Sequence, residues 1–240
     1  MKETISILER AWKFDSNVAK VFDKHVNQSI PHYDDLQKYI TSLSEWFLKD
    51  NSTVYDLGCS TGTTILNICK KNKNRNLKII GVDTGKKMIS LARKKINVNK
   101  QKKNKISVQL KWADINKIKK FKKADLFILV LIFPFLNYEN RKKILNKIYE
   151  SLNPGGALIV VDKVRSNHAH FEDILTQLYF DYKLEMKLTE EEIIKKSKSL
   201  RSSMHIFDQS QNEKLFIKSK FKRFDIFFKC FNFVGYLITK

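Results

Sequence analysis

Cysteine is scarce in this sequence, and the few that occur limit both the compartment and the chemistry. The 240 residues contain only Cys59, Cys69 and Cys230, so the cysteines cannot all pair, and their spacing matches no metal-binding motif. This pattern argues against a disulfide-rich secreted fold and against a structural metal site. A reducing, cytoplasmic setting is therefore expected.

Long hydrophobic runs are also missing. No apolar segment reaches the length that a membrane-spanning helix needs, and the first residues lack the hydrophobic region of a signal peptide. With only three prolines and seven glycines, the chain shows no Pro/Gly-rich linker and no internal repeat. Hydrophobic residues still make up 42% of the chain and aromatic residues 12%, as in globular proteins. We therefore expect one globular domain over residues 1–240 with no membrane partner.

Acidic residues are outnumbered by basic ones, 25 to 46, which gives a net charge of +21. The basic residues gather in runs at 70–75, 100–105, 117–123 and 195–201. Lysine predominates over arginine, and no aromatic residues are interleaved with the runs. This pattern favours a solvated surface over a dedicated nucleic-acid face, with weak attraction to tRNA as the alternative.

A glycine turn at residues 52–64 organises the chain. Residues 54–57 predict a short buried strand, Gly58 and Gly62 predict the turn, and residues 63–71 predict a helix. Glycines let a ligand approach the backbone, and the free N–H groups at the helix start can bind a polar ligand. A second strand at 77–83 ends in Asp83, which is well placed to bind ribose hydroxyls.

Strand-like and helix-like segments alternate along the rest of the core. Further strands are predicted at 106–112, 124–132 and 157–161, and helices at 86–98 and 139–152, the latter ended by residues 153–156. Such alternation predicts an α/β fold with a mostly parallel, doubly wound sheet. Because ligands bind at the carboxyl ends of parallel strands, Gly58, Asp83, Asp114 and the segment after Val130 should surround one crevice.

Helical segments are expected on both sides of this core, which spans residues 51–163. Residues 1–50 predict an N-terminal helical lid that includes an apolar stripe of Leu36, Ile40, Leu43, Trp46 and Phe47. Residues 164–205 predict a helical insertion over the crevice, with a stripe of Phe171, Ile174, Leu175, Leu178 and Tyr179. Residues 206–240 predict a last helix at 212–221 and an antiparallel strand pair at 224–230 and 233–239.

The glycine turn, the ribose acid and the terminal strand pair resemble class I S-adenosylmethionine-dependent methyltransferases. More specifically, nearly the whole chain resembles the carboxy-S-adenosylmethionine synthase family, which acts in bacterial tRNA wobble-uridine modification. The matching stretches are residues 12–22, 28–33, 54–60, 147–158 and 230–233. The resemblance implies a Rossmann-like fold with an antiparallel C-terminal strand, S-adenosylmethionine as cofactor, and a homodimer.

By position, the resemblance also implies a set of cofactor contacts. These are Tyr33, Gly58, Cys59, Ser60, Asp83, Thr84, Asp114 and Ile115, to which the turn adds Gly62 and the fourth strand adds Val130. Asp83 suits the ribose diol, and Asp114 suits the adenine amino group. The alternative for Asp114 is capping of the next helix, and the alternative for Cys59 is packing.

Two departures from the family concern the second reactant. The family has an asparagine where this chain has Val130, and Ser197 replaces the arginine that grips the carboxylate of carboxy-S-adenosylmethionine. Serine supplies no charge, and a lysine does not reproduce a bidentate guanidinium. Lys196, Lys198 or Arg201 could supply a replacement cation. Asp162 could contact the substrate or merely cap a helix.

The leading hypothesis is therefore a methyltransferase that transfers a plain methyl group to a small-molecule acceptor. The alternative is a carboxy-S-adenosylmethionine synthase that uses prephenate. A third possibility is a non-catalytic S-adenosylmethionine-binding protein that recognises RNA. The five histidines are scattered, and no catalytic residue is assigned, since an activated methyl group needs mainly positioning and exclusion of water.

Overall fold

The computed structural model describes residues 16–98 and 105–240. The N-terminal part of the predicted lid, including the resemblance at residues 12–15, lies outside the described residues, as does most of the basic run at 100–105. The following description concerns the described ranges.

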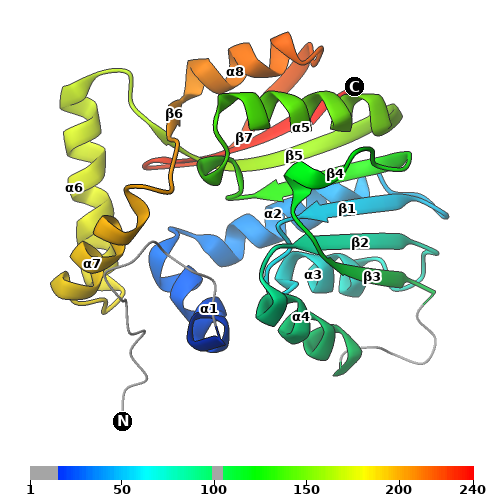
Figure 1. The fold of residues 1–240 in the computed structure, drawn as a ribbon, viewed down its shortest axis with the longest axis horizontal. Coiled ribbons are helices and arrows are strands. Elements are labelled where there is room, and N and C mark those ends of the chain that lie inside the picture. The colour runs from blue at the N-terminus through cyan, green and yellow to red at the C-terminus, as the bar shows by residue number, and fades with distance from the viewer. Residues whose placement is uncertain (1–15, 99–104) are drawn as a thin grey trace.

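A single mixed sheet forms the centre of the molecule (Figure 1). Its strands are β1 (Thr53–Leu57), β2 (Lys78–Asp83), β3 (Ser107–Trp112), β4 (Ala124–Val130), β5 (Leu152–Arg165), β6 (Phe207–Asp208), β7 (Arg223–Cys230) and β8 (Phe233–Thr239). The main path runs β3-β2-β1-β4-β5-β8-β7, with β6 beside the end of β5. Strands β1 to β5 are parallel, whereas β8 pairs antiparallel with both β5 and β7. The predicted fold class is confirmed.

Helices cover both faces and one end of the sheet. They are α1 (Ser16–Ser29), α2 (Tyr33–Glu45), α3 (Thr63–Lys71), α4 (Lys86–Val98), α5 (Tyr138–Ser151), α6 (Ala169–Glu185), α7 (Glu190–Leu200) and α8 (Gln209–Lys218). Helices α5 and α8 pack on one face, and α2, α3 and α4 pack on the other. Helices α1, α6 and α7 lie beyond one end of the sheet (Figure 1), as a lid and an insertion over the crevice require.

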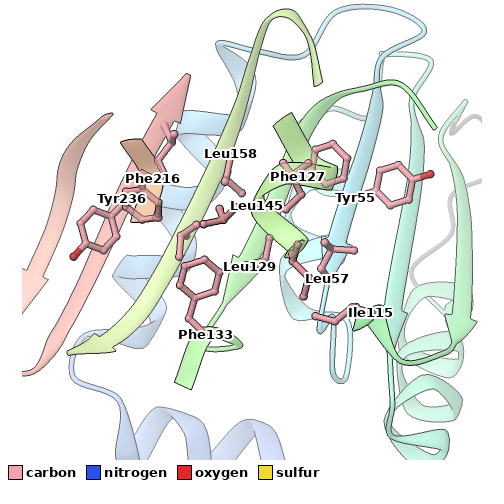
Figure 2. Packing of buried hydrophobic residues seen from close by; sticks show 14 of the residues in the cluster. Tyr55, Leu57, Ile115, Phe127, Leu129, Phe133, Leu145, Leu158, Phe216 and Tyr236 are labelled. Carbon is pink, nitrogen blue, oxygen red and sulfur yellow. The ribbon is translucent and has the colours of Figure 1, made fainter. Parts of the chain in front are cut away.

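The core is densest around β4. Leu126, Phe127, Ile128 and Leu129 are all fully buried, because helices cover both faces of this strand. Figure 2 shows one of the two apolar clusters, in which side chains of β1, β4, β5, α5 and α8 meet. There the rings of Tyr55 and Phe127 stack with centroids 4.9 Å apart. This packing fixes the strand ends that carry the candidate site.

Three predicted details differ from the structure. Trp46, expected in the buried stripe, is 85% exposed, because α2 ends at Glu45 and the chain turns away from the sheet. Strand β5 starts at Leu152, and the stop signal at residues 153–156 forms a bulge opposite β4. Helix α8 begins at Gln209, since Asp208 and Gln211 form a capping box there.

Candidate active site

A cavity of about 740 Å³ opens at the carboxyl ends of the parallel strands. One wall is formed by the turns after β1, β2, β3 and β4, and the other by α1, α6, α7 and the end of β5. Most of the predicted site residues face it: Tyr33, Gly58, Cys59, Ser60, Asp83, Thr84, Asp114, Ile115, Val130, Lys196, Ser197 and Arg201. The cavity therefore lies where the sequence predicts a crevice, and residues of α6 and α7 form part of its wall.

The glycine turn brings the backbone to the cavity surface. Gly58 has a φ of 84°, and a Cβ atom there would collide with the side chain of Ile132. Its N–H donates to the Val82 carbonyl over 2.7 Å, which ties the turn to β2. Gly62 is the N-cap of α3 with a φ of 79° but does not line the cavity. The two glycines thus have different roles, one at the cavity and one at the helix start.

Asp83 is held in a fixed orientation. Its Oδ2 accepts from the Ser60 N–H at 2.8 Å and its Oδ1 from the Gly85 N–H at 2.7 Å. Burial raises its pKa, although these two amides act against the rise. Asp114 caps the short 3-10 helix Ile115–Lys117 by accepting from the Asn116 N–H. Asp114 therefore adopts the capping role that was the alternative to an adenine contact, and it also lines the cavity.

Asp56 is a site residue that the sequence interpretation missed. It lies within the glycine-turn motif, is 2% exposed and lines the cavity, yet its Oδ2 has no hydrogen-bond partner among the residues that the structure describes. Burial, with a smaller contribution from Asp83, raises its pKa to about 7. A buried acid without a partner is costly unless a ligand satisfies it. A ligand that carries an ammonium group, such as S-adenosylmethionine, fits this position.

Tyr33 and Asp23 attach the lid to the glycine turn and the helix after it. The Tyr33 hydroxyl accepts from Gln37, whose side-chain oxygen accepts in turn from the Thr64 hydroxyl at 3.0 Å. Asp23 of α1 accepts from the Thr61 hydroxyl at 2.5 Å and from Lys95 at 2.6 Å. Burial opposes ionisation of Asp23, but the Lys95 and Thr61 hydrogen bonds hold its pKa below the ordinary value.

Three lysines line the side of the cavity that β5, α6 and α7 form: Lys163 of β5, Lys183 of α6 and Lys196 of α7. We call these three residues the lysine wall. The Lys183 ammonium lies 3.8 Å and the Lys163 ammonium 5.0 Å from the centroid of the Tyr179 ring. Burial, and then repulsion from Lys163, lowers the pKa of Lys183 to about 7. Burial, and then repulsion from Lys183 and Lys163, also lowers the pKa of Lys196 to about 7.

The side of helix α6 that faces the cavity shares only Tyr179 with the predicted apolar stripe. Phe171, Ile174 and Leu178 of the predicted stripe are exposed, whereas Tyr179 is buried. The side that lines the cavity carries Glu172, Thr176, Tyr179, Phe180 and Lys183. The apolar stripe is therefore largely a face turned away from the cavity, and the groups that line the cavity lie on another side of this helix.

Two predicted substrate contacts lie outside the cavity. Lys198 is exposed on α7 and does not line it. Asp162 is fully buried and accepts from Arg141 at 3.1 Å and from Asn212 at 2.8 Å. Arg141, itself fully buried, also donates to the Leu136 and His205 carbonyls. Asp162 thus belongs to a network beneath the cavity rim.

Neither a metal cluster nor a membrane span is found in the ranges 16–98 and 105–240. No group of three or more histidine, cysteine or acidic residues is placed to hold a metal ion there. No helix in the same ranges is long and apolar enough to cross a bilayer.

Comparison with known proteins agrees with the geometry. A family model described as a methyltransferase domain matches residues 48–227. A curated carboxy-S-adenosyl-L-methionine synthase of Staphylococcus epidermidis is 35% identical, over 95% of this chain and 97% of the relative. A relative of the same name from Shewanella sp. strain ANA-3 is 31% identical, over 95% of this chain and 93% of its own length. The chain belongs to the carboxy-S-adenosylmethionine synthase family.

Solved structures show the same fold at lower identity. A plantazolicin methyltransferase in complex with S-adenosylhomocysteine matches with a TM-score of 0.63 at 18% identity, over 95% of this chain and 91% of that one. An O-methyltransferase family protein of Burkholderia thailandensis gives 0.66 at 11% identity, over 95% and 60%. Family membership makes this chain a transferase that uses S-adenosylmethionine, and the cavity contains residues that suit this cofactor.

Proposed function

We propose that this protein is a carboxy-S-adenosylmethionine synthase that acts on S-adenosylmethionine and prephenate. The supporting observation is the lysine wall, which puts three cations on the side of the cavity formed by β5, α6 and α7, whereas Asp56 and Asp83 lie at the ends of β1 and β2. The reaction places carboxylates in this cavity, and a carboxylate removed from water needs a cationic partner. Lys196, next to Ser197 on α7, is the nearest of these lysines in sequence to the missing arginine.

Different residues of the cavity would bind the cofactor and the anionic reactant. Bound S-adenosylmethionine supplies an activated sulfonium methyl group. Asp83 would bind the ribose, Asp114 the adenine amino group, and Asp56 the ammonium group of the methionine part. Gly58 allows close backbone approach, while Tyr33 on the lid and the insertion helices shield the cavity from water. The lysine wall would orient the anionic reactant, so positioning is the main contribution of these residues.

Plain methyl transfer to a small-molecule acceptor is the second candidate. Val130 and Ser197 both line the cavity. Val130 lacks the amide of the family's asparagine, and Ser197 lacks the positive charge of the family's arginine. These two residues remove contacts to a carboxylated cofactor without removing the cofactor-binding turn. The cavity would then hold an anionic acceptor beside the lysine wall.

Mass spectrometry separates the two candidates. The purified protein is incubated with S-adenosylmethionine and prephenate, and the nucleoside products are analysed. We expect a product heavier than S-adenosylmethionine by one carbon dioxide. If S-adenosylmethionine stays unchanged in mass under these conditions, the synthase proposal is wrong and methyl transfer is favoured.

The proposal also includes the location of the protein, its oligomeric state and its relation to tRNA. Three free cysteines support a cytoplasmic location. The exposed apolar residues Phe171, Ile174 and Leu178 of α6 support a homodimer, which light scattering would test. A role in tRNA modification would follow from synthase activity, while direct contact with tRNA would be weak.

A further inference from the structure

Asn232 presents a buried hydrogen-bond acceptor at the cavity. It occupies the two-residue turn between β7 and β8, lines the cavity and is 3% exposed. Its backbone carbonyl accepts from the Val164 N–H at 2.7 Å, which fixes the turn against β5. Its side-chain Oδ1 is buried and has no hydrogen-bond partner among the residues that the structure describes. A buried amide oxygen without a partner is costly, so a donor group on a ligand would stabilise it.

Glu172 determines which way the Asn232 amide faces. The Asn232 Nδ2 lies 3.1 Å from Oε1 and 3.2 Å from Oε2 of Glu172. Because a carboxylate only accepts hydrogen bonds, the amide nitrogen must face Glu172 and the amide oxygen must face away from it. Glu172 is itself held, since its Oε2 accepts from the Ser166 N–H at 2.7 Å and its Oε1 from the Thr176 hydroxyl at 3.4 Å. The orientation of the acceptor is therefore fixed before a ligand binds.

The sheet order places this acceptor on the side of the cavity away from the cofactor-binding turns. Strands β4 and β5 separate β1, which precedes the glycine turn, from β8. Lys163 of the lysine wall lies opposite Phe233, the residue after Asn232, in the register of β5 and β8. Asn232 thus lies beside the region that we assign to the anionic reactant. We expect its hydrogen-bond donor to come from that reactant and not from S-adenosylmethionine.

We infer that Asn232, oriented by Glu172, accepts a hydrogen bond from a hydroxyl group of the second reactant. The inference deepens the proposed function and rests on it for the identity of that reactant. Prephenate carries a ring hydroxyl group in addition to its two carboxylates, so one molecule can use both the lysine wall and Asn232. The lysines attract any small carboxylate, whereas Asn232 selects a carboxylate that also carries a hydroxyl. An analogue without the hydroxyl binds more weakly, because the buried acceptor then stays unpaired.

Three ligands that differ at one ring position test this preference. 4-Hydroxyphenylpyruvate, 4-fluorophenylpyruvate and phenylpyruvate are titrated by calorimetry into protein saturated with S-adenosylhomocysteine, which lacks the reactive methyl group. The substituted position lies opposite the pyruvyl side chain, where prephenate has its hydroxyl, and only the first ligand has a donor there. We expect this ligand to bind about fivefold or more tighter than the other two. Equal binding of the hydroxyl and fluoro ligands would overturn the inference, and so would the absence of binding by all three.

Substitutions assign the preference to Asn232. Asn232→Ala removes the acceptor, so the hydroxyl and fluoro ligands should bind within about twofold of each other. Glu172→Gln keeps the shape of the side chain but donates as well as accepts, which frees the Asn232 amide to rotate, so the preference should fall by at least about half. Gln177→Ala, on the exposed side of α6, is the control and should leave the preference unchanged. A full preference in Asn232→Ala would overturn the inference.

Further measurements keep the outcomes separate. Thermal unfolding and S-adenosylhomocysteine titration of each variant show whether its fold and cofactor site are intact. If Asn232→Ala does not fold, the three ligands still decide the question in the wild-type protein and in Glu172→Gln. A hydroxyl preference that depends on Asn232, without formation of the carboxylated product from prephenate, would contradict the proposed function alone. Product formation without a hydroxyl preference would contradict the inference alone.

Discussion

At the scale of single residues, the carboxylates of Asp56 and Asp83 differ in the hydrogen bonds that the protein offers them. Asp83 accepts two backbone hydrogen bonds, whereas one oxygen of Asp56 has no partner within the described part of the chain. The first carboxylate is oriented by the protein, and the second depends on a ligand. Substitution of Asp83 should therefore act mainly on cofactor binding. Substitution of Asp56 should change both cofactor binding and the stability of the ligand-free protein.

Asp83→Asn should weaken S-adenosylmethionine binding by about 1.5–3 kcal/mol, because charged hydrogen bonds to the ribose are lost. Titration calorimetry measures the change, with Asp173→Asn on the exposed side of α6 as the control. An unchanged affinity in a folded variant would contradict the assignment of Asp83.

Asp56→Asn should stabilise the ligand-free protein above pH 7. The pKa of Asp56 is raised from 3.8 to about 7, so the folded state binds more protons than the unfolded state between these values. Stability contributed by the protonated acid is thus lost as the pH rises toward 7. The variant should gain up to roughly 4 kcal/mol at pH 8 and little at pH 4. Denaturant unfolding checks this, and cofactor binding should weaken at the same time.

At the scale of elements, Asp23 is one of the residues that attach the lid. Asp23 joins α1 to the glycine turn through Thr61 and to α4 through Lys95. Asp23→Asn and Lys95→Met should each speed cofactor release in stopped-flow measurements, with a coupling energy of about 0.5–1 kcal/mol since the pair is partly exposed. Lys94→Met, exposed on the same helix, is the control. Additive effects of the two substitutions would exclude a shared contact.

The alternation of strands and helices could be predicted from the sequence because buried strands and amphipathic helices have distinct periods. The inner side of α6 could not, since apolar spacing reports which residues share a face and not whether that face meets a core or a cavity. Lys163 and Lys183 carried no local signal for the same reason. Their proximity depends on β5 and α6 meeting in three dimensions. The predicted roles of individual site residues stay predictions.

At the scale of the whole molecule, the net charge of +21 is distributed mainly over exposed lysines. Such a surface attracts any polyanion through counterion release, without selecting a sequence. Affinity for tRNA should therefore be weak and should fall steeply with salt, to a negligible level at about 0.15 M. Electrophoretic titration at several salt concentrations measures this. A tight, sequence-selective complex at that salt concentration would show a dedicated RNA surface instead.

The buried Arg141 restricts how the cavity can open. It binds the Leu136 carbonyl on one side of the rim, the His205 carbonyl where the insertion returns to the sheet, and Asp162 below. Moving this part of the rim would break these hydrogen bonds and leave the guanidinium and its acceptors buried without partners. We therefore expect this side of the cavity rim to stay in place when the cavity opens. Helix α1 contacts the glycine turn and α4 through the side chain of Asp23, which is partly exposed, so we expect reactants and products to pass beneath this helix.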